Sequence, residues 1–325
     1  MKKILLVLLS LTLVLSLAAC SGEGNNDETN VSEFPNKNIE IIVAYKAGGG
    51  TDVGARVLAS AAEDVFGQSI VILNKPGSDG ELGYTELTKS NPDGYTLGFI
   101  NLPTYVSLTL ERDTEYEIGD VEPILNHVYD SGVLVVQGTS EWDTLEDFID
   151  YAKANPGEIT ISNNGTGASN HIGAAHLEYE AGIDVTHVPF GGSTDMLAAL
   201  RGGHVDATVA KISEVANLVE AGELRILASF TEERLGDFSD VPTLKEKGYD
   251  ILFGSARALV APKGTPQEII DILHDGFKEA LESEEHMENA KNAALPIQYM
   301  SPEELSEYIK NEEIYLNEIR EIIDL

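Results

Sequence analysis

Two glycine-rich segments carry the residue types best suited to holding an anion. Residues 46–52 (KAGGGTD) and 163–169 (NNGTGAS) each follow a short apolar run and precede a helix-like run. A helix leaves its first backbone N–H groups unpaired, and the positive end of its dipole lies there. Glycine lets a ligand come close to the backbone. Each segment therefore predicts an anion-binding loop at a helix N-terminus.

A third segment has the same order of elements but a weaker pattern. Residues 185–188 form an apolar run, and residues 189–193 (PFGGS) lead into the next helix-like run. One such loop is weak evidence, because every strand-to-helix connection needs a turn. Three of them, each ending in Ser or Thr at a helix start, predict a cleft at the carboxyl ends of the strands.

Enzyme motifs do not fit these loops. The phosphate loop of nucleotide hydrolases needs Gly-x4-Gly-Lys-Ser/Thr, and neither main loop has that lysine; a dinucleotide-binding fingerprint starting at Gly165 would need glycine where Asn170 stands. The sequence contains no Gly-x-Ser-x-Gly elbow and no His-Glu-x-x-His pair. Ser169 and His171 could be considered as nucleophile and base, but helix capping and ligand contact explain both better. We therefore predict no catalytic residue, no cofactor and no metal.

The charge of the chain narrows the kind of partner. It has 55 acidic and 21 basic residues among 325, a formal net charge of −34. This excess argues against nucleic acid as a partner and against docking on anionic lipid by charge alone. It does not exclude an anionic ligand, because helix N-termini make a pocket locally positive whatever the net charge.

The first 35 residues predict export and anchoring. Residues 1–19 combine a charged start, an apolar run and small residues before a cut, which is typical of a secretory signal peptide. Cys20, the one cysteine of the sequence, follows Leu-Ala-Ala as in a bacterial lipobox, so we expect it to carry lipid at the mature N-terminus. Ordinary cleavage beside an incidental cysteine is the alternative. Residues 20–35 are polar and aperiodic and predict a flexible tether.

From residue 39 onward strand-like and helix-like runs alternate, which predicts an α/β fold with parallel sheets. The strand-like runs are residues 39–45, 69–74, 95–100, 121–126, 133–137, 159–162, 184–188, 207–210 and 224–230. Helix-like runs are residues 51–66, 144–154, a run from residue 171, 194–201, 266–281 and 302–323. The body that follows the tether is large enough for two lobes.

Three residues near the predicted cleft have more than one interpretation. Asp52 either complements the helix dipole from the first turn, or shapes the loop and accepts a hydrogen bond from the ligand. Lys46 and Arg257 are candidates for extra positive charge at the site, and the alternative for each is a solvated surface cation.

A series of short motifs runs along the chain. They are residues 34–39 (FPNKNI), 47–52 (AGGGTD), 55–56 (AR), 74–77 (NKPG), 91–97 (NPDGYTL), 151–157 (YAKANPG), 187–190 (HVPF), 200–206 (LRGGHVD), 221–225 (AGELR), 240–243 (DVPT) and 261–266 (APKGTP). Together they resemble the substrate-binding proteins of tripartite tricarboxylate transporters, the Bug family, over about residues 34–325. The chain departs from the family's pattern at Ala256, where members often have Trp, and at Lys46, where many have an apolar residue or Pro.

The resemblance implies a two-lobed fold of the periplasmic-binding-protein type (type 2-like), each lobe a mostly parallel sheet flanked by helices. Residues 36–130 and 230–325 would form lobe 1 and residues 131–229 lobe 2, with a hinge near residues 130–133 and 228–231. It also implies capture of a small carboxylate (a tricarboxylate, dicarboxylate or related organic acid) by lobe closure. The expected ligand-binding residues are Tyr45, Gly48, Gly49, Gly50, Thr51, Asp52, Asn101, Asn163, Gly165, Thr166, Gly167, Ser169, Phe190, Gly192, Ser193 and Arg257.

The implied partners are the membrane permease subunits of such a transporter, with a monomeric protein anchored through lipid on Cys20 at the outer face of the cell membrane or in the periplasm. One alternative is a binding protein of the same fold that presents a carboxylate to a receptor kinase. A carboxylate-converting enzyme is the rival from another class, and the missing nucleophile, metal and cofactor signatures weigh against it.

Overall fold

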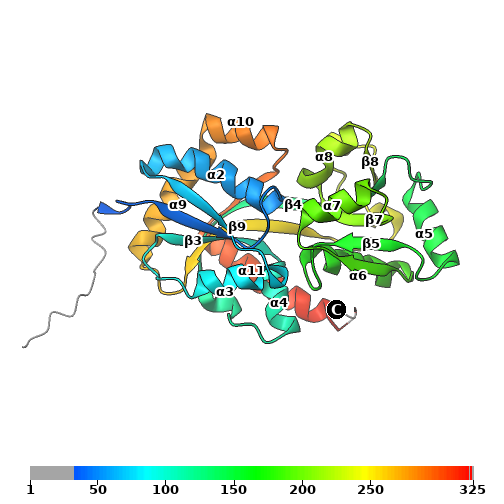
Figure 1. The fold of residues 1–325 in the computed structure, drawn as a ribbon, viewed down its shortest axis with the longest axis horizontal. Coiled ribbons are helices and arrows are strands. Elements are labelled where there is room, and N and C mark those ends of the chain that lie inside the picture. Colours follow the sequence, from blue (N-terminus) through cyan, green and yellow to red (C-terminus); the bar gives the residue numbers. More distant parts are fainter. Residues whose placement is uncertain (1–32, 322, 324–325) are drawn as a thin grey trace, which may run out of the picture. The chain divides into compact units, whose positions relative to one another are not determined.

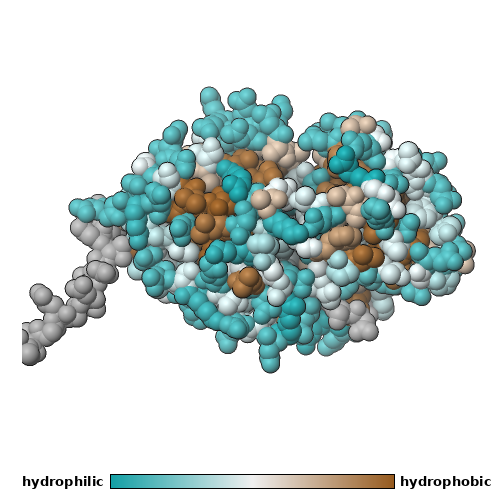
Figure 2. Space-filling model, viewed as in Figure 1, coloured by the Kyte–Doolittle hydropathy of each residue, from teal (hydrophilic) through white to brown (hydrophobic). Residues whose placement is uncertain are grey.

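The computed structural model describes residues 33–321 and 323 (Figure 1). The chain divides into two compact units, Met1–Phe34 and Pro35–Leu325, and the second is described below. The predicted signal peptide, Cys20 and most of the predicted tether lie outside the described residues. Every described helix is too short or too polar to span a bilayer. The face seen in Figure 2 is mainly hydrophilic, as expected from 55 acidic residues.

The first sheet joins the earliest strands of the unit to its last ones. β1 lies between β2 and β3 and runs parallel to both. β9 pairs antiparallel with β3 and with β4, and β10 pairs antiparallel with β4. The strands are β1 (Ile39–Val43), β2 (Ile70–Asn74), β3 (Thr96–Leu102), β4 (Val121–Gln137), β9 (Gly254–Pro262) and β10 (Ile297–Met300).

Helices cover both faces of this sheet. α2, α9 and α10 pack together on one face, and α3, α4 and α11 lie on the other (Figure 1). Ile269, Leu273 and Phe277 form part of the buried side of α9, as the apolar stripe of that segment predicts. The helices are α2 (Gly50–Phe66), α3 (Glu81–Thr88), α4 (Thr104–Glu111), α9 (Gln267–Glu282), α10 (Glu284–Asn292) and α11 (Pro302–Ile319).

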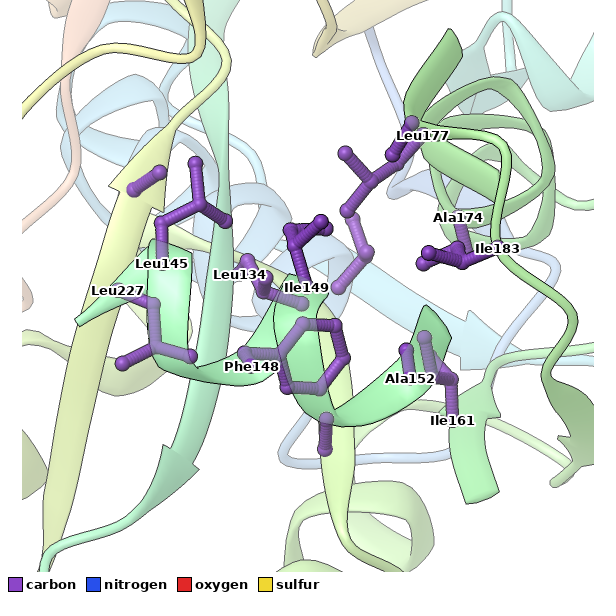
Figure 3. Packing of buried hydrophobic residues seen from close by; sticks show 14 of the residues in the cluster. Leu134, Leu145, Phe148, Ile149, Ala152, Ile161, Ala174, Leu177, Ile183 and Leu227 are labelled. Atoms are coloured by element: carbon purple, nitrogen blue, oxygen red, sulfur yellow. The ribbon is translucent and has the colours of Figure 1, made fainter. Parts of the chain in front are cut away.

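The second sheet contains β5, β6, β7 and β8 together with the end of β4. β5 runs parallel to β6 and β7, whereas β4 pairs antiparallel with β7 and β8. Leu134 of β4 faces a core with Phe148 and Ile149 of α5 (Figure 3), and Val133 and its alternate neighbours face a second core under α7 and α8. The elements are β5 (Thr160–Asn163), β6 (Thr186–Pro189), β7 (Ala207–Lys211), β8 (Leu224–Ser229), α5 (Leu145–Ala154), α6 (Ser169–Ala181), α7 (Ser193–Arg201) and α8 (Ile212–Glu220).

These two layered bodies, called the first lobe and the second lobe below, confirm the predicted α/β fold. The sheets themselves are mixed. β1 to β3 and β5 to β7 are parallel, but every pairing of β4, β8, β9 and β10 is antiparallel. The prediction of mostly parallel sheets came from the alternating segments, and it missed β9 and β10, which return through the first sheet in the opposite direction.

One long strand crosses from the first lobe to the second. The sequence predicts two strands, residues 121–126 and 133–137, with a break between them. The structure instead has a continuous β4, because Ser131 pairs with Gly254 of β9 and the next residue, Gly132, pairs with Lys211 of β7. The strand therefore changes its hydrogen-bonding partners, and not its own conformation, where the lobes meet.

Residues 230–253 pack differently from the predicted division of the chain. The prediction assigns them to lobe 1, but Phe230, Leu244, Ile251 and Phe253 belong to the core of the second lobe. The segment includes two short 3-10 helices, η4 (Gly236–Phe238) and η5 (Lys245–Lys247). Its packing favours a second crossing just before β9, near residue 253, in place of residues 228–231. The lobe boundaries otherwise stay a prediction.

Some elements gave no clear signal in the sequence. β9 is buried along its whole length, but Ser255 and Arg257 interrupt its apolar run. α10 is mostly polar, with His286 and Ala290 as its buried residues. β10, α3, α4 and α8 are also absent from the prediction, because each spans no more than nine residues and the apolar period of so short a segment is ambiguous.

A buried histidine pair lies in the first lobe between β4 and α10. The Nε2 atoms of His127 and His286 are 2.7 Å apart, and both rings are fully buried. Burial lowers the pKa of His127 well below its ordinary value, with His286 and Arg257 adding to the effect, and burial also lowers the pKa of His286. Both rings are therefore neutral in the folded protein at neutral pH.

We expect acid to destabilise the protein through this pair. The pKa of such a histidine is lower in the folded protein than in the unfolded chain, where it is about 6.5. Above pH 6.5 the stability is complete, and as the pH falls below this value the unfolded chain takes up the proton first and the free energy of unfolding decreases. Each histidine can remove up to about 1.4 kcal/mol per pH unit. Urea unfolding between pH 7.5 and 5 should show this fall, and the double variant H127L/H286L should flatten it. The exposed His204 provides the control H204Q, and equal slopes in all three proteins would contradict the expectation.

Candidate functional site

A cavity lies between the two lobes at the ends of their parallel strands. It is nearly closed in this structure, with a free volume of about 10 Å³, room for about one water molecule. Its walls are the segment after β1, the starts of α2, α6, α7 and α8, the ends of β3 and β7, and the residue after β5. The lining residues are Tyr45, Lys46, Gly49, Gly50, Thr51, Asn101, Asn164, Asn170, Gly192, Ser193, Thr194, Lys211 and Glu214.

The first glycine loop brings the start of α2 to this cavity. Gly49 precedes the helix in an extended conformation, and no side chain caps it. The first-turn N–H groups of α2 thus have no partner within the helix, and they point toward the loop. Thr51 is nearly buried in that first turn. This loop has the geometry that the sequence predicts for an anion site.

Asp52 shapes the first loop. Its carboxylate accepts hydrogen bonds from the Gly48 N–H (2.9 Å), Arg56 Nε (3.0 Å) and Asn74 Nδ2 (2.9 Å). Burial raises the pKa of Asp52, but the hydrogen bonds from Arg56, Gly48 and Asn74 outweigh it, so the pKa lies below its ordinary value. Gly48 takes a positive φ of 85°, which allows the turn around this carboxylate. Of the two interpretations of Asp52, the geometry favours the loop-shaping one.

The second glycine loop mostly faces the first lobe. Asn163 Oδ1 accepts from the Gly165 N–H (3.0 Å) and folds the loop back. Gly165 and Gly167 both have positive φ, and a Cβ on either would overlap Asp79 or Glu111 of the first lobe. These glycines allow the lobes to approach. The cavity is lined instead by Asn164 and Asn170, while Thr166 is exposed.

The third loop contributes two of its three predicted residues to the cavity. Gly192 and Ser193 line it, and Ser193 Oγ donates to Glu214 Oε1 (2.8 Å). Phe190 is half-buried and packs against the core of the second lobe under α7 and α8. Phe190 therefore packs at the edge of that core and is not among the residues that line the cavity.

Ser169 and Asn170 form hydrogen bonds with Lys211, a residue that the sequence did not identify as part of the site. Lys211 Nζ lies 3.3 Å from Ser169 Oγ and 3.0 Å from Asn170 Oδ1, and Lys211 is fully buried. His171 instead accepts from the Gly167 N–H through Nδ1 (3.1 Å). One available signal for Lys211 was its place directly after the strand-like run 207–210, at the strand end where the glycine loops also lie.

Arg257 forms an internal ion-pair network at the junction of the lobes. Its guanidinium contacts Asp130 Oδ2 of β4 (2.7 Å) and Glu214 Oε1 of α8 (3.3 Å), and all three side chains are buried. Asp130 also accepts from the Ser213 N–H (3.1 Å) and from Ser213 Oγ. Arg257 lies behind the first loop, since a Cβ on Gly50 would overlap its guanidinium. Its charge is compensated by protein groups, and it does not line the cavity.

Lys46 bridges the lobes at the edge of the cavity. Its ammonium pairs with Asp195 of α7, and both side chains are about half exposed. An exposed pair of this kind contributes little stability. Lys46 thus supports contact between the first loop and α7.

Among residues 33–321 and 323, no group of three or more His, Cys, Asp or Glu side chains is arranged to hold a metal.

Two lobes that enclose a cavity walled by helix N-termini define the class of solute-binding proteins. The family model described as tripartite tricarboxylate transporter family receptor (TctC) matches residues 54–325. The chain belongs to this family, which confirms the resemblance noted in the sequence. The family is one of solute-binding receptors and not of enzymes.

Relatives of known sequence support the assignment along most of the chain. Protein BugT of Bordetella pertussis is 33% identical over 284 residues, 86% of this chain and 87% of the relative. A UPF0065 protein from the gbd 5' region of Cupriavidus necator is 35% identical over 297 residues, 91% of this chain and 89% of the relative.

Solved structures of the same kind superpose closely. A Rhodopseudomonas palustris protein with adipate has a TM-score of 0.84 and 27% identity, covering 89% of this chain and 98% of its own. MatC of Rhodopseudomonas palustris with bound malate has a TM-score of 0.83 and 25% identity, covering 88% and 99%.

Removing the cation of the ion-pair network should destabilise the fold. Arg257→Met leaves Asp130 and Glu214 buried without compensation, which typically costs about 3–5 kcal/mol. Guanidinium chloride unfolding measures this loss. Lys278→Met removes an exposed pair with Glu282 and serves as the control, with little or no change expected in stability. Equal stability of the two variants would show that the network is not needed for folding.

Proposed function

We propose that this protein captures a small organic carboxylate between its lobes and delivers it to the permease subunits of a tripartite tricarboxylate-type transporter. The observation that carries the proposal is the convergence of α2, α7 and Lys211 on one cavity. Helix N-termini favour anions, and a lysine adds a full positive charge. The adipate and malate in two structural neighbours support a carboxylate as the ligand.

Contacts between the lobes support enclosure of the ligand. Ser107 Oγ of α4 donates to the Gly167 carbonyl (2.7 Å), and the Ser169 N–H donates to Thr104 Oγ1 (3.0 Å). With the lobes apart these groups would be hydrated. Each charge-assisted hydrogen bond to the ligand contributes about 1.5–3 kcal/mol. A handful, after the cost of ordering, gives roughly the −8 kcal/mol of micromolar binding.

The cavity narrows the set of residues proposed to touch the ligand. Tyr45, Gly49, Gly50, Thr51, Asn101, Gly192 and Ser193 of the predicted set line it. Gly48, Asp52, Asn163, Gly165 and Gly167 hold loop shape or lobe contact. Such a site binds and releases its ligand unchanged, so we propose no catalytic activity, and a monomer as the working form.

A panel of ligands tests the proposal by thermal shift. Malate, adipate, citrate, acidic amino acids and aromatic acids are compared with sugars and amines. A true ligand at 100 times its Kd stabilises the folded state by about 2.7 kcal/mol. We expect at least one carboxylate to raise Tm. A response to a sugar or an amine, with none to any carboxylate, would contradict the proposal.

A charge placed in the cavity should abolish that response. Thr51 lies in the first turn of α2 and lines the cavity, so Thr51→Glu puts a carboxylate where the ligand's carboxylate is proposed to bind. Thr166→Glu adds the same charge on the exposed side of the second loop and should leave the response unchanged. Retained binding by the Thr51 variant would move the site elsewhere.

We also propose that lipid on Cys20 anchors the protein at the outer face of the membrane. The support is the lipobox-like sequence before that cysteine. Cys20→Ser should release the protein into the soluble fraction after cell lysis and fractionation. Unchanged membrane association of the variant would count against lipid anchoring.

A further inference from the structure

Lys211 is a buried cation in the wall of the ligand cavity. It is the last residue of β7, and groups of α6 and of the segment before β9 surround its ammonium. Its ammonium contacts Ser169 Oγ and Asn170 Oδ1 of α6, and it lies 4.0 Å from the centre of the Phe253 ring. In the described chain its hydrogen bonds thus go to neutral acceptors. A buried ammonium is stable only when a negative group or strong acceptors offset its lost hydration.

The two nearby carboxylates contact Arg257 and not Lys211, although one guanidinium offsets the charge of only one of them. Asp130 of β4 and Glu214 of α8 both contact the guanidinium of Arg257 of β9. They act on Lys211 through space but form no contact with its Nζ among the described interactions. The two acids also accept hydrogen bonds from Ser213 and Ser193. Lys211 is therefore the cation of the cavity without a contacting carboxylate of its own.

Two amide side chains in the cavity wall have an oxygen atom without a hydrogen-bond partner among the described residues. Asn101 Oδ1 and Asn164 Oδ1 line it, are buried, and have no hydrogen-bond partner among the described residues. Buried polar atoms are normally paired, and an amide oxygen needs a hydrogen-bond donor, so these two atoms mark the position of a bridging water or of a hydroxyl group of the ligand. Asn101 belongs to β3 of the first lobe and Asn164 to the second glycine loop. The polar groups that need a partner thus face the cavity from both lobes.

We propose that Lys211 forms a direct ion pair with one carboxylate of the ligand and selects ligands that carry a second carboxylate for the N-termini of α2 and α7. The inference rests on the proposed function and specifies it. Two separate positive centres line one cavity, and a monocarboxylate satisfies one of them. Lys211 is then the residue that distinguishes dicarboxylates from monocarboxylates of the same length.

Binding is coupled to proton uptake. Burial lowers the pKa of Lys211 to about 7; Glu214 and Asp130 raise it and Arg257 lowers it further. A ligand carboxylate at the ammonium favours the charged form and raises the pKa. At pH 8 Lys211 of the free protein is largely neutral, so binding takes up a proton at this residue. Affinity falls as the pH rises, with an expected increase in Kd of about 10- to 100-fold from pH 7 to 9.

Calorimetry on the wild-type protein tests this directly. Titration of malate, adipate and citrate at pH 8 in two buffers of different ionisation enthalpy gives the number of protons taken up. An uptake of more than about half a proton for a bound acid supports the inference. A wild type that binds none of the three contradicts this inference, and one that also responds to no acid of the thermal-shift panel contradicts the carboxylate function as well. Binding with no proton uptake and no change in Kd between pH 7 and 9 overturns the inference alone.

Two variants separate charge from packing. Lys211→Met keeps the length of the side chain, and should weaken adipate binding by about 10- to 150-fold at pH 7. It should also bring the adipate affinity close to that of hexanoate, which lacks the second carboxylate. Lys211→Arg stays charged to high pH, so it should bind adipate with a Kd that changes little from pH 7 to 9.

Glu111→Gln is the matched control. Burial raises the pKa of Glu111 to about 7, and this residue faces Gly167 at the lobe contact without lining the cavity. Its proton could also couple to closure. Proton uptake that persists in the Glu111 variant and disappears in the Lys211→Met variant supports the assignment. Loss of uptake in the Glu111 variant, with Lys211→Met unchanged, overturns it. Far-UV circular dichroism and Tm of each variant establish that it is folded.

Discussion

The buried ion pairs of Arg257 are the constraint on which the rest of the site depends. A guanidinium removed from water must be compensated, and Asp130 and Glu214 do this from two different lobes. The network fixes the start of α8 against β4 and β9. It also requires glycine at position 50, because any side chain there would overlap the Arg257 guanidinium. Arg257 offsets one of these two negative charges, and the charge that remains acts on Lys211 beside the cavity.

This local balance explains how so acidic a protein is suited to an anion. The chain carries a formal net charge of −34, and its surface is correspondingly hydrophilic. Surface charges are screened by salt within about 10 Å, whereas dipoles and charges in an enclosed cavity are screened much less. The first-turn amides of α2 and α7 and the Lys211 ammonium therefore outweigh distant carboxylates. Net charge bears on solubility and nonspecific partners, and it does not decide what one cavity binds.

The sequence predicted the parts of the site that depend on local backbone geometry. The loop before α2 and the loop before α7 lie at the cavity, as their glycines and helix starts indicate. It failed where neighbours in space decide the outcome. Phe190 packs at the edge of a core, Thr166 is exposed, and Arg257 is neutralised by Asp130 and Glu214, none of which its own segment reveals. Lys211 was missed because a lone lysine after a strand has no distinctive pattern.

The sequence by itself determined the α/β fold, the family and the glycine loops. Apolar periodicity, turn residues and short motifs involve residues that are close together in the chain, so they can be recognised in the sequence alone. Tertiary structure alone decided which of those loops line the cavity, which glycines serve lobe contact, and that the chain crosses between the lobes within β4 and just before β9. It also decided the charge state of the site. Burial and pairing set the energy of each ionic group, and both depend on residues more than a hundred positions apart, such as Asp130 and Arg257.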